Sequence, residues 1–201
     1  DACRAEGYEP ILLTDCLCCE AREAGSLLGS IARTHAGQGR KRAFIAGGET
    51  VVHLTGHGLG GRNQELALAA APALAGLRGC CVFSVGSDGT DGPTDAAGGY
   101  TDGEALAALT AAGLDVPRAL ADNDAYHALQ AVGGLIMTGP TGTNVNDVAV
   151  VLTESQKADR CGAGFCHPQA DGQDAGDRLK TPSSVCFCNS LLDGKAPPLS
   201  W

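Results

Sequence analysis

The sequence has few aromatic residues, few basic residues and no long apolar run. Trp, Tyr and Phe together make up only 4% of the chain, so its apolar weight comes from Ala, Leu and Val. Lys and Arg number 14 against 23 Asp and Glu, and this net charge of -9 argues against a nucleic-acid binder, which needs a basic face. No apolar stretch approaches the ~20 residues that span a bilayer, so no membrane segment is expected.

The first residues, Asp1-Ala2-Cys3-Arg4, contain neither Met nor a signal-peptide pattern, and we expect the chain to be cut from a longer polypeptide. Several of the ten Cys lie in or beside apolar stretches, and adjacent Cys of a strand point to opposite faces. We therefore expect free thiols in a reducing compartment. This favours a cytoplasmic location and also allows a mitochondrial one.

Hydrophobic periodicity predicts strands that alternate with helices. Strands are expected at residues 11–14, 43–46, 51–55, 80–85, 135–138 and 148–152. Helices are expected at residues 20–34, 63–74, 104–112 and 123–132. This order indicates an α/β fold with a mixed or largely parallel sheet flanked by helices. One domain is expected over residues 1–153, whereas residues 154–201 lack apolar periodicity and are predicted to be a poorly ordered tail.

A Gly-rich loop follows the expected strand 51–55 and opens the helix that starts at Asn63. Its Gly56, Gly58 and Gly61 fit the G-x-G-x-x-G spacing of dinucleotide sites. The acid at the end of the next expected strand, Asp88, comes about 27 residues on, later than the ~20 of that fingerprint. Gly lets the backbone approach an anion, free N–H groups at the helix start face it, and Arg62 adds a fork for carboxylate or phosphate. The loop therefore predicts an anion site, with a simple tight turn and helix cap as the alternative.

An acidic loop follows the expected strand 80–85. Asp88, Asp91 and Asp95 are spaced by three and four residues with Gly between them, so a curled loop can bring them together. Such a loop suits Mg²⁺ or orients a substrate hydroxyl for deprotonation, and its spacing differs from that of an EF-hand. A solvated acidic turn is the alternative.

Two further loops carry polar groups at strand ends. Residues 138–147 place Thr141, Thr143 and Asn144 between two apolar strands, where hydroxyls and amides suit a phosphate or a small hydroxy acid. An ordinary connection is the alternative. Glu49 follows Gly47-Gly48 at the end of another expected strand.

Taken in order, these segments resemble the C-terminal domain of the class II glycerate kinases, the MOFRL domain, some members of which are labelled hydroxypyruvate reductase. The resemblance covers roughly residues 1–153. The matching strings are Gly-Gly-Glu-Thr (47–50), Gly-Gly-Arg-Asn-Gln-Glu-Leu-Ala-Leu (60–68), Asp-Gly-Thr-Asp-Gly-Pro-Thr-Asp-Ala-Ala-Gly (88–98), Asn-Asp (123–124) and Thr-Gly-Pro-Thr-Gly-Thr-Asn-Val-Asn-Asp (138–147). Residues 19–23 (Cys-Glu-Ala-Arg-Glu) also resemble the family's Gly-Glu-Ala-Arg segment, with Cys19 where Gly is usual.

The resemblance implies a kinase that transfers phosphate from ATP to D-glycerate, giving 2-phosphoglycerate, with Mg²⁺ or another divalent metal. The site would lie in a cleft shared with a larger N-terminal kinase domain, and a homo-oligomer is allowed. The implied catalytic residues are Arg62, Asp88 and Asp91, and the implied metal ligands are Asp88, Asp91 and Asp95. The residues implied to bind or brace substrate and phosphate are Glu49, Gly60, Gly61, Asn63, Glu65, Thr141, Thr143 and Asn144, with Asp147.

Other interpretations stay open. Because the N-terminal domain and its catalytic Lys are not in this chain, a non-catalytic binding module is one, and a reductase is another, although no complete nicotinamide fingerprint is present. His53 and His57 flank the Gly-rich loop as a candidate base or as surface residues. A zinc site in the tail competes with incidental Cys there; its ligands would be Cys161, Cys166, His167, Cys186 and Cys188.

Overall fold

The computed structural model describes residues 1–154. The tail predicted over residues 154–201 therefore lies outside the described residues, apart from Glu154. The tail zinc hypothesis lies outside them as well.

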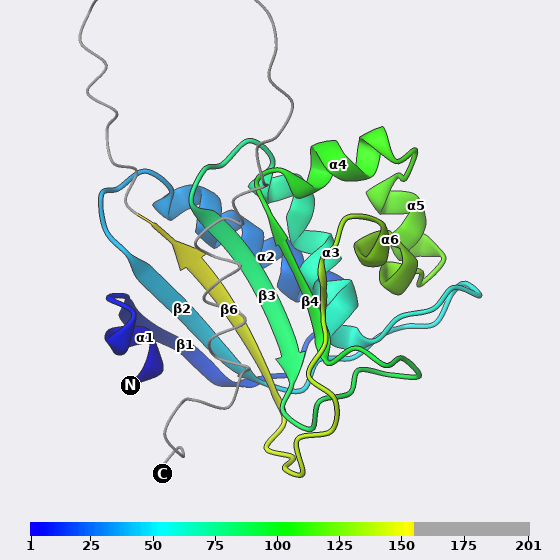
Figure 1. Cartoon of the computed structure of the whole chain (residues 1–201), viewed down its shortest axis with the longest axis horizontal. Coiled ribbons are helices and arrows are strands. Elements are labelled where there is room, and N and C mark those ends of the chain that lie inside the picture. The colour runs from blue at the N-terminus through cyan, green and yellow to red at the C-terminus, as the bar shows by residue number, and fades with distance from the viewer. Residues whose placement is uncertain (155–201) are drawn as a thin grey trace, which may run out of the picture.

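A six-stranded mixed sheet forms the centre of the fold, with strand order β1-β2-β6-β3-β4-β5 (Figure 1). The strands are β1 (Glu9–Leu17), β2 (Arg42–Gly48), β3 (Cys80–Gly86), β4 (Gly98–Asp102), β5 (Leu135–Ile136) and β6 (Asp147–Thr153). Among these, only β1 and β2 are parallel neighbours, and each other pair is antiparallel. The predicted α/β fold is confirmed, with the sheet in its mixed form.

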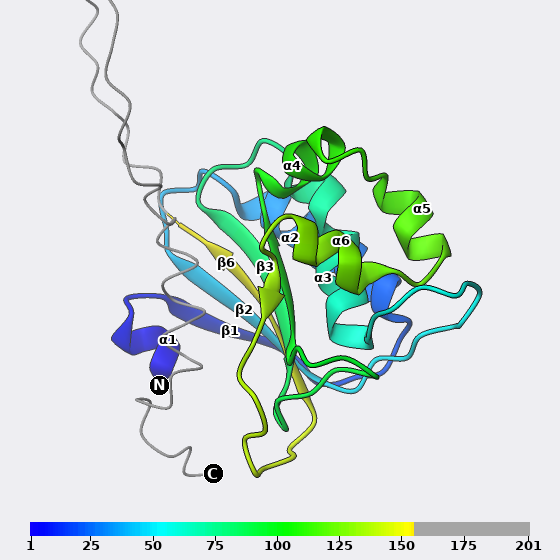
Figure 2. The ribbon, with the colours of Figure 1, turned by 45° about the vertical axis from the view of Figure 1, so that its right-hand side comes forward.

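The larger helices lie together on one face of the sheet, as Figure 2 shows. They are α2 (Ala21–His35) and α3 (Arg62–Leu74), followed by α4 (Ala105–Ala111), α5 (Val116–Ala121) and α6 (Ala125–Ala131). A short helix, α1 (Ala2–Ala5), precedes β1. Helix α3 contributes Leu66, Ala70 and Leu74 to the core against the sheet, and Ala67 and Leu68 to the core under α4, α5 and α6. It is therefore the central helix of the domain.

Small residues allow α2 and α3 to approach closely. A Cβ on Gly25 of α2 would lie 2.1 Å from the Leu66 carbonyl oxygen, and one on Gly29 would lie 2.8 Å from the Ala73 Cβ. Arg33 of α2 also donates from Nε to the carbonyl oxygen of Ala73, near the C-terminal end of α3. Since α3 begins directly after the Gly-rich loop and carries Arg62, this packing fixes where Arg62 and the end of that loop lie.

Most predicted elements are present within two residues of their expected bounds, and the differences have local causes. Residues 51–55 form no strand; only Val51 makes an isolated bridge, to Glu20. The sequence reasoning missed α1, β4 and α5. Strand β4 reads Gly-Gly-Tyr-Thr-Asp, which has little apolar alternation, and it forms by pairing with β3. Helix α5 starts with an Asp115 cap and a Pro in its first turn.

The sheet topology brings three loops to one edge. Strands β2 and β3 both run antiparallel to β6, so the last residue of each lies beside the first residue of β6. In the register, Asp147 pairs with Gly48 on one side and with Gly86 on the other. The segments after Gly48 and Gly86 and the segment before Asp147 therefore meet at the lower edge of the sheet in Figure 1.

We expect Gly25→Ala to destabilise the protein even though Ala favours helix by about 1 kcal/mol, because the new Cβ collides with the α3 backbone. A loss of about 1–3 kcal/mol in the free energy of unfolding is predicted from urea denaturation. Ser26→Ala, on the exposed side of the same helix, is the control and should be neutral or slightly stabilising. A Gly25→Ala variant as stable as this control would contradict the close helix packing.

Candidate functional site

Arg62 lies at the centre of the sheet edge. Its Nε donates to Asp147 Oδ2 at 2.5 Å and its Nη2 to Asp147 Oδ1 at 3.1 Å, a two-pronged pair. Its Nη1 lies 3.2 Å from Glu49 Oε1. The hydrogen bond to Asp147 raises the pKa of Arg62 against its partial desolvation, and the charges of Asp147, Glu49 and Asp91 raise it further. One guanidinium therefore faces an excess of carboxylates.

Asp91 caps the start of α3 from another loop. Its Oδ1 accepts hydrogen bonds from the Asn63 backbone N (3.1 Å) and Asn63 Nδ2 (3.2 Å), and its Oδ2 accepts from the Gln64 backbone N at 2.8 Å. These two backbone groups are among those that a helix N-terminus leaves unpaired. A Cβ on Gly61 would lie 2.3 Å from Asp91 Cγ, so Gly61 is needed for this carboxylate to approach.

The cap is completed by a buried polar network. Gln64 accepts from the Gly61 backbone N through Oε1, and its Nε2 donates to Thr94 Oγ1 at 2.7 Å. Ser84, in the middle of the buried strand β3, donates from Oγ to Asn63 Oδ1 at 2.5 Å. Asn63 and Gln64 are buried, and they join α3 to both β3 and the acidic loop. A hydroxyl in an otherwise apolar strand was the sequence signal for this partner, and it was missed.

Glu65 is the second buried acid of α3. Its Oε1 accepts from Arg22 Nε at 3.1 Å and its Oε2 accepts from Asn123 Nδ2 at 3.2 Å. Burial raises the pKa of Glu65, while Asn123 and Arg22 lower it. At 2% exposure Glu65 has no access to a ligand, so it braces the site by joining α2, α3 and the Asn123 turn.

The backbone of the Gly-rich loop is bound to the turn before α6. Asn123, at a left-handed φ of 56°, accepts through Oδ1 from the backbone N of Thr55 and of Gly56. Gly58 N donates to the Asp122 carbonyl oxygen, and a Cβ on Gly58 would lie 2.4 Å from Asp124 Cβ. The glycines therefore allow close approach of protein backbone. The Asp91 cap takes the Asn63 and Gln64 backbone N–H groups, which contradicts the expectation that these two groups of the helix start face an anion.

The three acids of the acidic loop point to different partners. Asp91 faces α3, and Asp95 Oδ1 accepts from the Tyr126 hydroxyl at 2.8 Å. Asp88 Oδ1 accepts from the Thr90 backbone N. Within residues 1–154, no three His, Cys, Asp or Glu side chains gather closely enough to hold a metal ion. The structure thus does not bring Asp88, Asp91 and Asp95 together, and the convergence expected from their spacing is wrong.

Asp88 instead lies near Asp147. A Cβ on Gly86 would lie 3.1 Å from Asp88 Oδ1 and 3.5 Å from Asp147 Oδ1, so both carboxylates border the same glycine. The half-buried Asp88 makes no hydrogen bond through Oδ2 within the described part of the chain. Asp88, Asp147 and the Arg62 that pairs with Asp147 are therefore the charged side chains that lie near one another at the sheet edge.

The loop before β6 packs on the acidic loop. Thr141 donates from Oγ1 to the Ser87 carbonyl oxygen at 2.5 Å, and Val145 N donates to Ser87 Oγ at 2.7 Å. Asn144 Oδ1 accepts from the Asn146 backbone N in a local turn. Thr141, Thr143 and Asn144 are all exposed at this edge. Thr141 lies beside Asp88, whose carbonyl oxygen accepts from the Thr141 backbone N at 3.1 Å. The role of Thr141, Thr143 and Asn144 in binding phosphate or substrate stays a prediction, as does that of Gly60 and Gly61.

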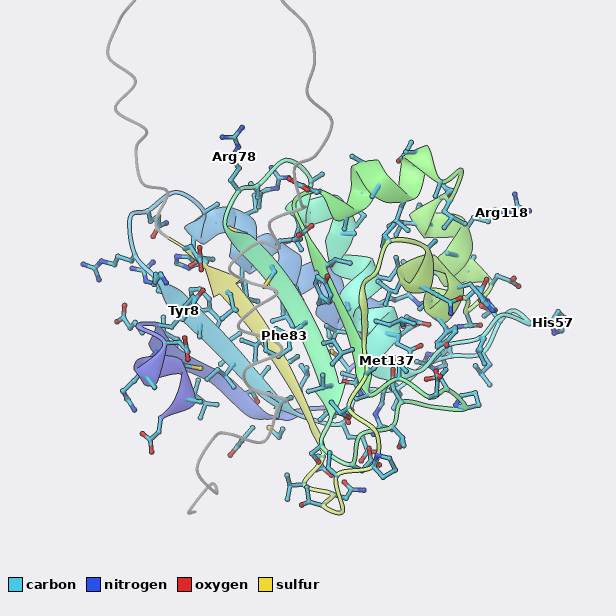
Figure 3. All side chains as sticks on the ribbon, viewed as in Figure 1. Tyr8, His57, Arg78, Phe83, Arg118 and Met137 are labelled. Atoms are coloured by element: carbon cyan, nitrogen blue, oxygen red, sulfur yellow. The ribbon has the colours of Figure 1, made fainter. Side chains whose placement is uncertain are left out.

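Both histidines near the Gly-rich loop lie on the surface. His53 is exposed, with its Nδ1 3.4 Å from Glu20 Oε2. Figure 3 shows His57 at the outer tip of the loop, pointing away from the domain. The interpretation of these residues as surface histidines agrees with the structure.

The sequence matches the MOFRL family over residues 42–147. This chain belongs to the MOFRL family. The D-glycerate 2-kinase of Thermotoga maritima is 51% identical over 153 residues, which are 74% of this chain and 37% of that protein. The glycerate 2-kinase of Pyrococcus horikoshii is 42% identical over 156 residues, 75% of this chain and 35% of that protein. Two relatives from Agrobacterium vitis carry a hydroxypyruvate reductase name. One is 39% identical over 74% of this chain and 40% of that protein. The other is 40% identical over 73% of this chain and 35% of that protein.

The fold is also that of a solved relative. The crystal structure of a Thermotoga maritima glycerate kinase superposes with a TM-score of 0.72 at 51% identity, covering 75% of this chain and 37% of that one. The chain thus spans little more than a third of the length of the curated relatives it matches. None of the helices in residues 1–154 has the length and apolarity needed to cross a membrane.

We expect Asp91→Asn to lower the free energy of unfolding by about 1–3 kcal/mol, since an amide cannot accept from both Asn63 and Gln64 through two oxygens. Urea denaturation at neutral pH measures this loss. Asp95→Asn, an exposed change of the same kind in the same loop, should cost less than about 0.5 kcal/mol. Equal stability of the two variants would contradict the capping role of Asp91.

The same residue gives a pH dependence. Burial raises the pKa of Asp91 from 3.8 to about 6, against the hydrogen bonds from Gln64 and Asn63. The folded protein then holds this proton at pH values where the unfolded chain has lost it, a contribution present below about pH 4 and lost as the pH rises to about 6. The stability of the wild type relative to Asp91→Asn should therefore fall across this range. Parallel pH profiles would contradict the raised pKa.

Proposed function

We propose that this chain is the C-terminal domain of a kinase that transfers phosphate from ATP to D-glycerate, giving 2-phosphoglycerate. The observation that carries the proposal is the sheet edge where Arg62 pairs with Asp147 and Asp88 lies near Asp147. The segments that build this edge lie in the region that matches the MOFRL family, and two relatives of the chain are named glycerate 2-kinases. Phosphoryl transfer requires mainly positioning and charge neutralisation. The guanidinium supplies positive charge, and a nearby carboxylate can position a hydroxyl or hold a metal ion.

In this mechanism Arg62 binds the oxyanion of glycerate or of a transferred phosphoryl group. Asp147 holds the guanidinium in position, because it pairs with it through two hydrogen bonds and is itself only 9% exposed. Asp88, at the end of β3, is placed to accept the proton of the attacking hydroxyl or to bind a metal. Asp91, Asn63 and Glu65 act through the structure, since their polar atoms are bound within the protein.

The residues present fit Mg²⁺ only in part. Mg²⁺ in kinases is held by one or two carboxylates together with substrate phosphates. Asp88 would provide one carboxylate, and the Asp147 carboxylate borders the same glycine, Gly86. Asp91 and Asp95 instead accept hydrogen bonds from α3 and from Tyr126. A bound Mg²⁺ would neutralise charge on the phosphates of ATP. The remaining residues of the cleft, including the catalytic Lys, are proposed to come from an N-terminal domain.

A hydroxypyruvate reductase is the second candidate because two relatives carry that name. It would need a nicotinamide cofactor. The described Gly-rich loop has its backbone groups bound by Asn123 and Asp122, so it does not supply the phosphate cradle of a dinucleotide site. A non-catalytic binding module is the third candidate.

The kinase proposal is tested by exchanging the domain into a whole enzyme. Residues 1–153 replace the matching region of the Thermotoga maritima D-glycerate 2-kinase, and ADP formation is measured with D-glycerate and Mg²⁺-ATP. We expect the exchanged enzyme to phosphorylate glycerate. Arg62→Ala should then lower kcat/KM by about 10²–10³-fold, because it removes a preorganised donor to the oxyanion.

Arg118→Ala is the matched control. Arg118 is exposed on α5, forms no side-chain ion pair within residues 1–154, and points away from the domain in Figure 3. It should keep full activity. Arg62→Ala activity equal to that of this control would contradict the role of Arg62. NADH oxidation with hydroxypyruvate, and no ADP formation, would favour the reductase.

A further inference from the structure

The two carboxylates that bind Arg62 are held very differently. Asp147 makes two hydrogen bonds to the guanidinium, and its side chain is only 9% exposed. Glu49 makes a single contact at 3.2 Å, and its side chain is 57% exposed. Exposed single-contact ion pairs contribute little free energy, whereas two-pronged, enclosed pairs are stronger. Glu49 is therefore the partner that can leave.

The backbone of Glu49 is fixed although its carboxylate is not. Glu49 N donates to the Leu17 carbonyl oxygen at 2.8 Å. The preceding Gly48 has a φ of 145°, and a Cβ there would lie 2.3 Å from Leu17 N. The side chain thus starts from a constant position beside Arg62, and rotation about its own bonds is enough to move its carboxylate to solvent.

We propose that Glu49 is an internal competitor for the oxyanion site of Arg62. Its carboxylate contacts Arg62 Nη1, and the carboxylate of a hydroxy acid or a phosphate group takes its place when it binds. Arg62 has a side chain that is 35% exposed, so an incoming anion can reach it. Asp147 stays in place and keeps the guanidinium oriented. This inference rests on the proposed function for the nature of the bound anion.

Charge gives Glu49 a second effect. Arg62 carries one positive charge, and the carboxylates of Asp147, Glu49 and Asp91 all act on it. Glu49 leaves Arg62 by breaking a single contact at Nη1. Moving Asp147 would break a two-pronged pair, and moving Asp91 would break a helix cap. Neutralising Glu49 should therefore strengthen anion binding, which is the opposite of what a substrate-binding residue would do.

Inorganic phosphate and D-glycerate are the two probes, titrated separately into the 201-residue chain while the Arg62 Nε–Hε resonance is followed by NMR. We expect Glu49→Gln to bind phosphate about two- to fivefold more tightly than the wild type, the factor that an exposed ion pair supports. The increase should shrink at high salt. A similar increase for glycerate would show that carboxylates use the same position, and an increase for phosphate alone would assign the position to a phosphoryl group.

Glu104→Gln is the matched control, because Glu104 is an exposed acid before α4 with no side-chain partner within residues 1–154. It changes the net charge equally and should bind phosphate as the wild type does. Glu49→Ala, with its fold checked by circular dichroism, serves as a second variant. Equal or weaker phosphate binding by folded Glu49→Gln and Glu49→Ala, or no phosphate binding by any folded form, would overturn the inference. Loss of glycerate phosphorylation in the exchanged enzyme would affect only the kinase proposal.

Discussion

The carboxylate of Asp91 at the start of α3 is the interaction on which the rest of the site depends. It accepts from two backbone N–H groups of a helix that is buried between the sheet and the other helices. Such groups are costly to leave unpaired away from water. Because the carboxylate comes from the loop after β3, capping the helix also fixes that loop against α3. Arg62, the first residue of the helix, is thereby set between the ends of β2 and β3, where Asp147 meets it.

The sheet edge is one wall of a site, and its charge explains why it needs another. Arg62 is surrounded by carboxylates, and Asp88 adds a further acid beside Asp147. An anionic substrate binds this surface more tightly when additional positive charge is supplied, which a divalent metal and a Lys-bearing domain would do in the proposed kinase. The matched relatives are more than twice as long as the region they share with this chain, which leaves ample length for such a domain.

The sequence predicted the strongly periodic elements well, and it predicted the site by position better than by role. Helices α2 and α3 and strands β2, β3 and β6 have apolar patterns that determine their burial locally. Strand β4 forms by pairing with β3. Residues 51–55 do not form a strand, and the Thr55 backbone N donates to Asn123 Oδ1 instead of to a neighbouring strand. The spacing of the acidic loop predicted three acids that converge, whereas Asp91 caps α3 instead. It could not show that Asp91 turns inward, since that depends on the contact with Gly61, a residue 30 positions earlier in the chain.

Amide hydrogen exchange at Asn63 and Gln64 tests the central claim most directly. These two backbone N–H groups lie in the first turn of α3, where amides usually exchange quickly because they have no partner within the helix. If Asp91 accepts from both, they should exchange as slowly as the amides in the interior of α3 and become fast in Asp91→Asn. Exchange as fast as that of the exposed residues of the 138–146 loop in the wild type would contradict the account.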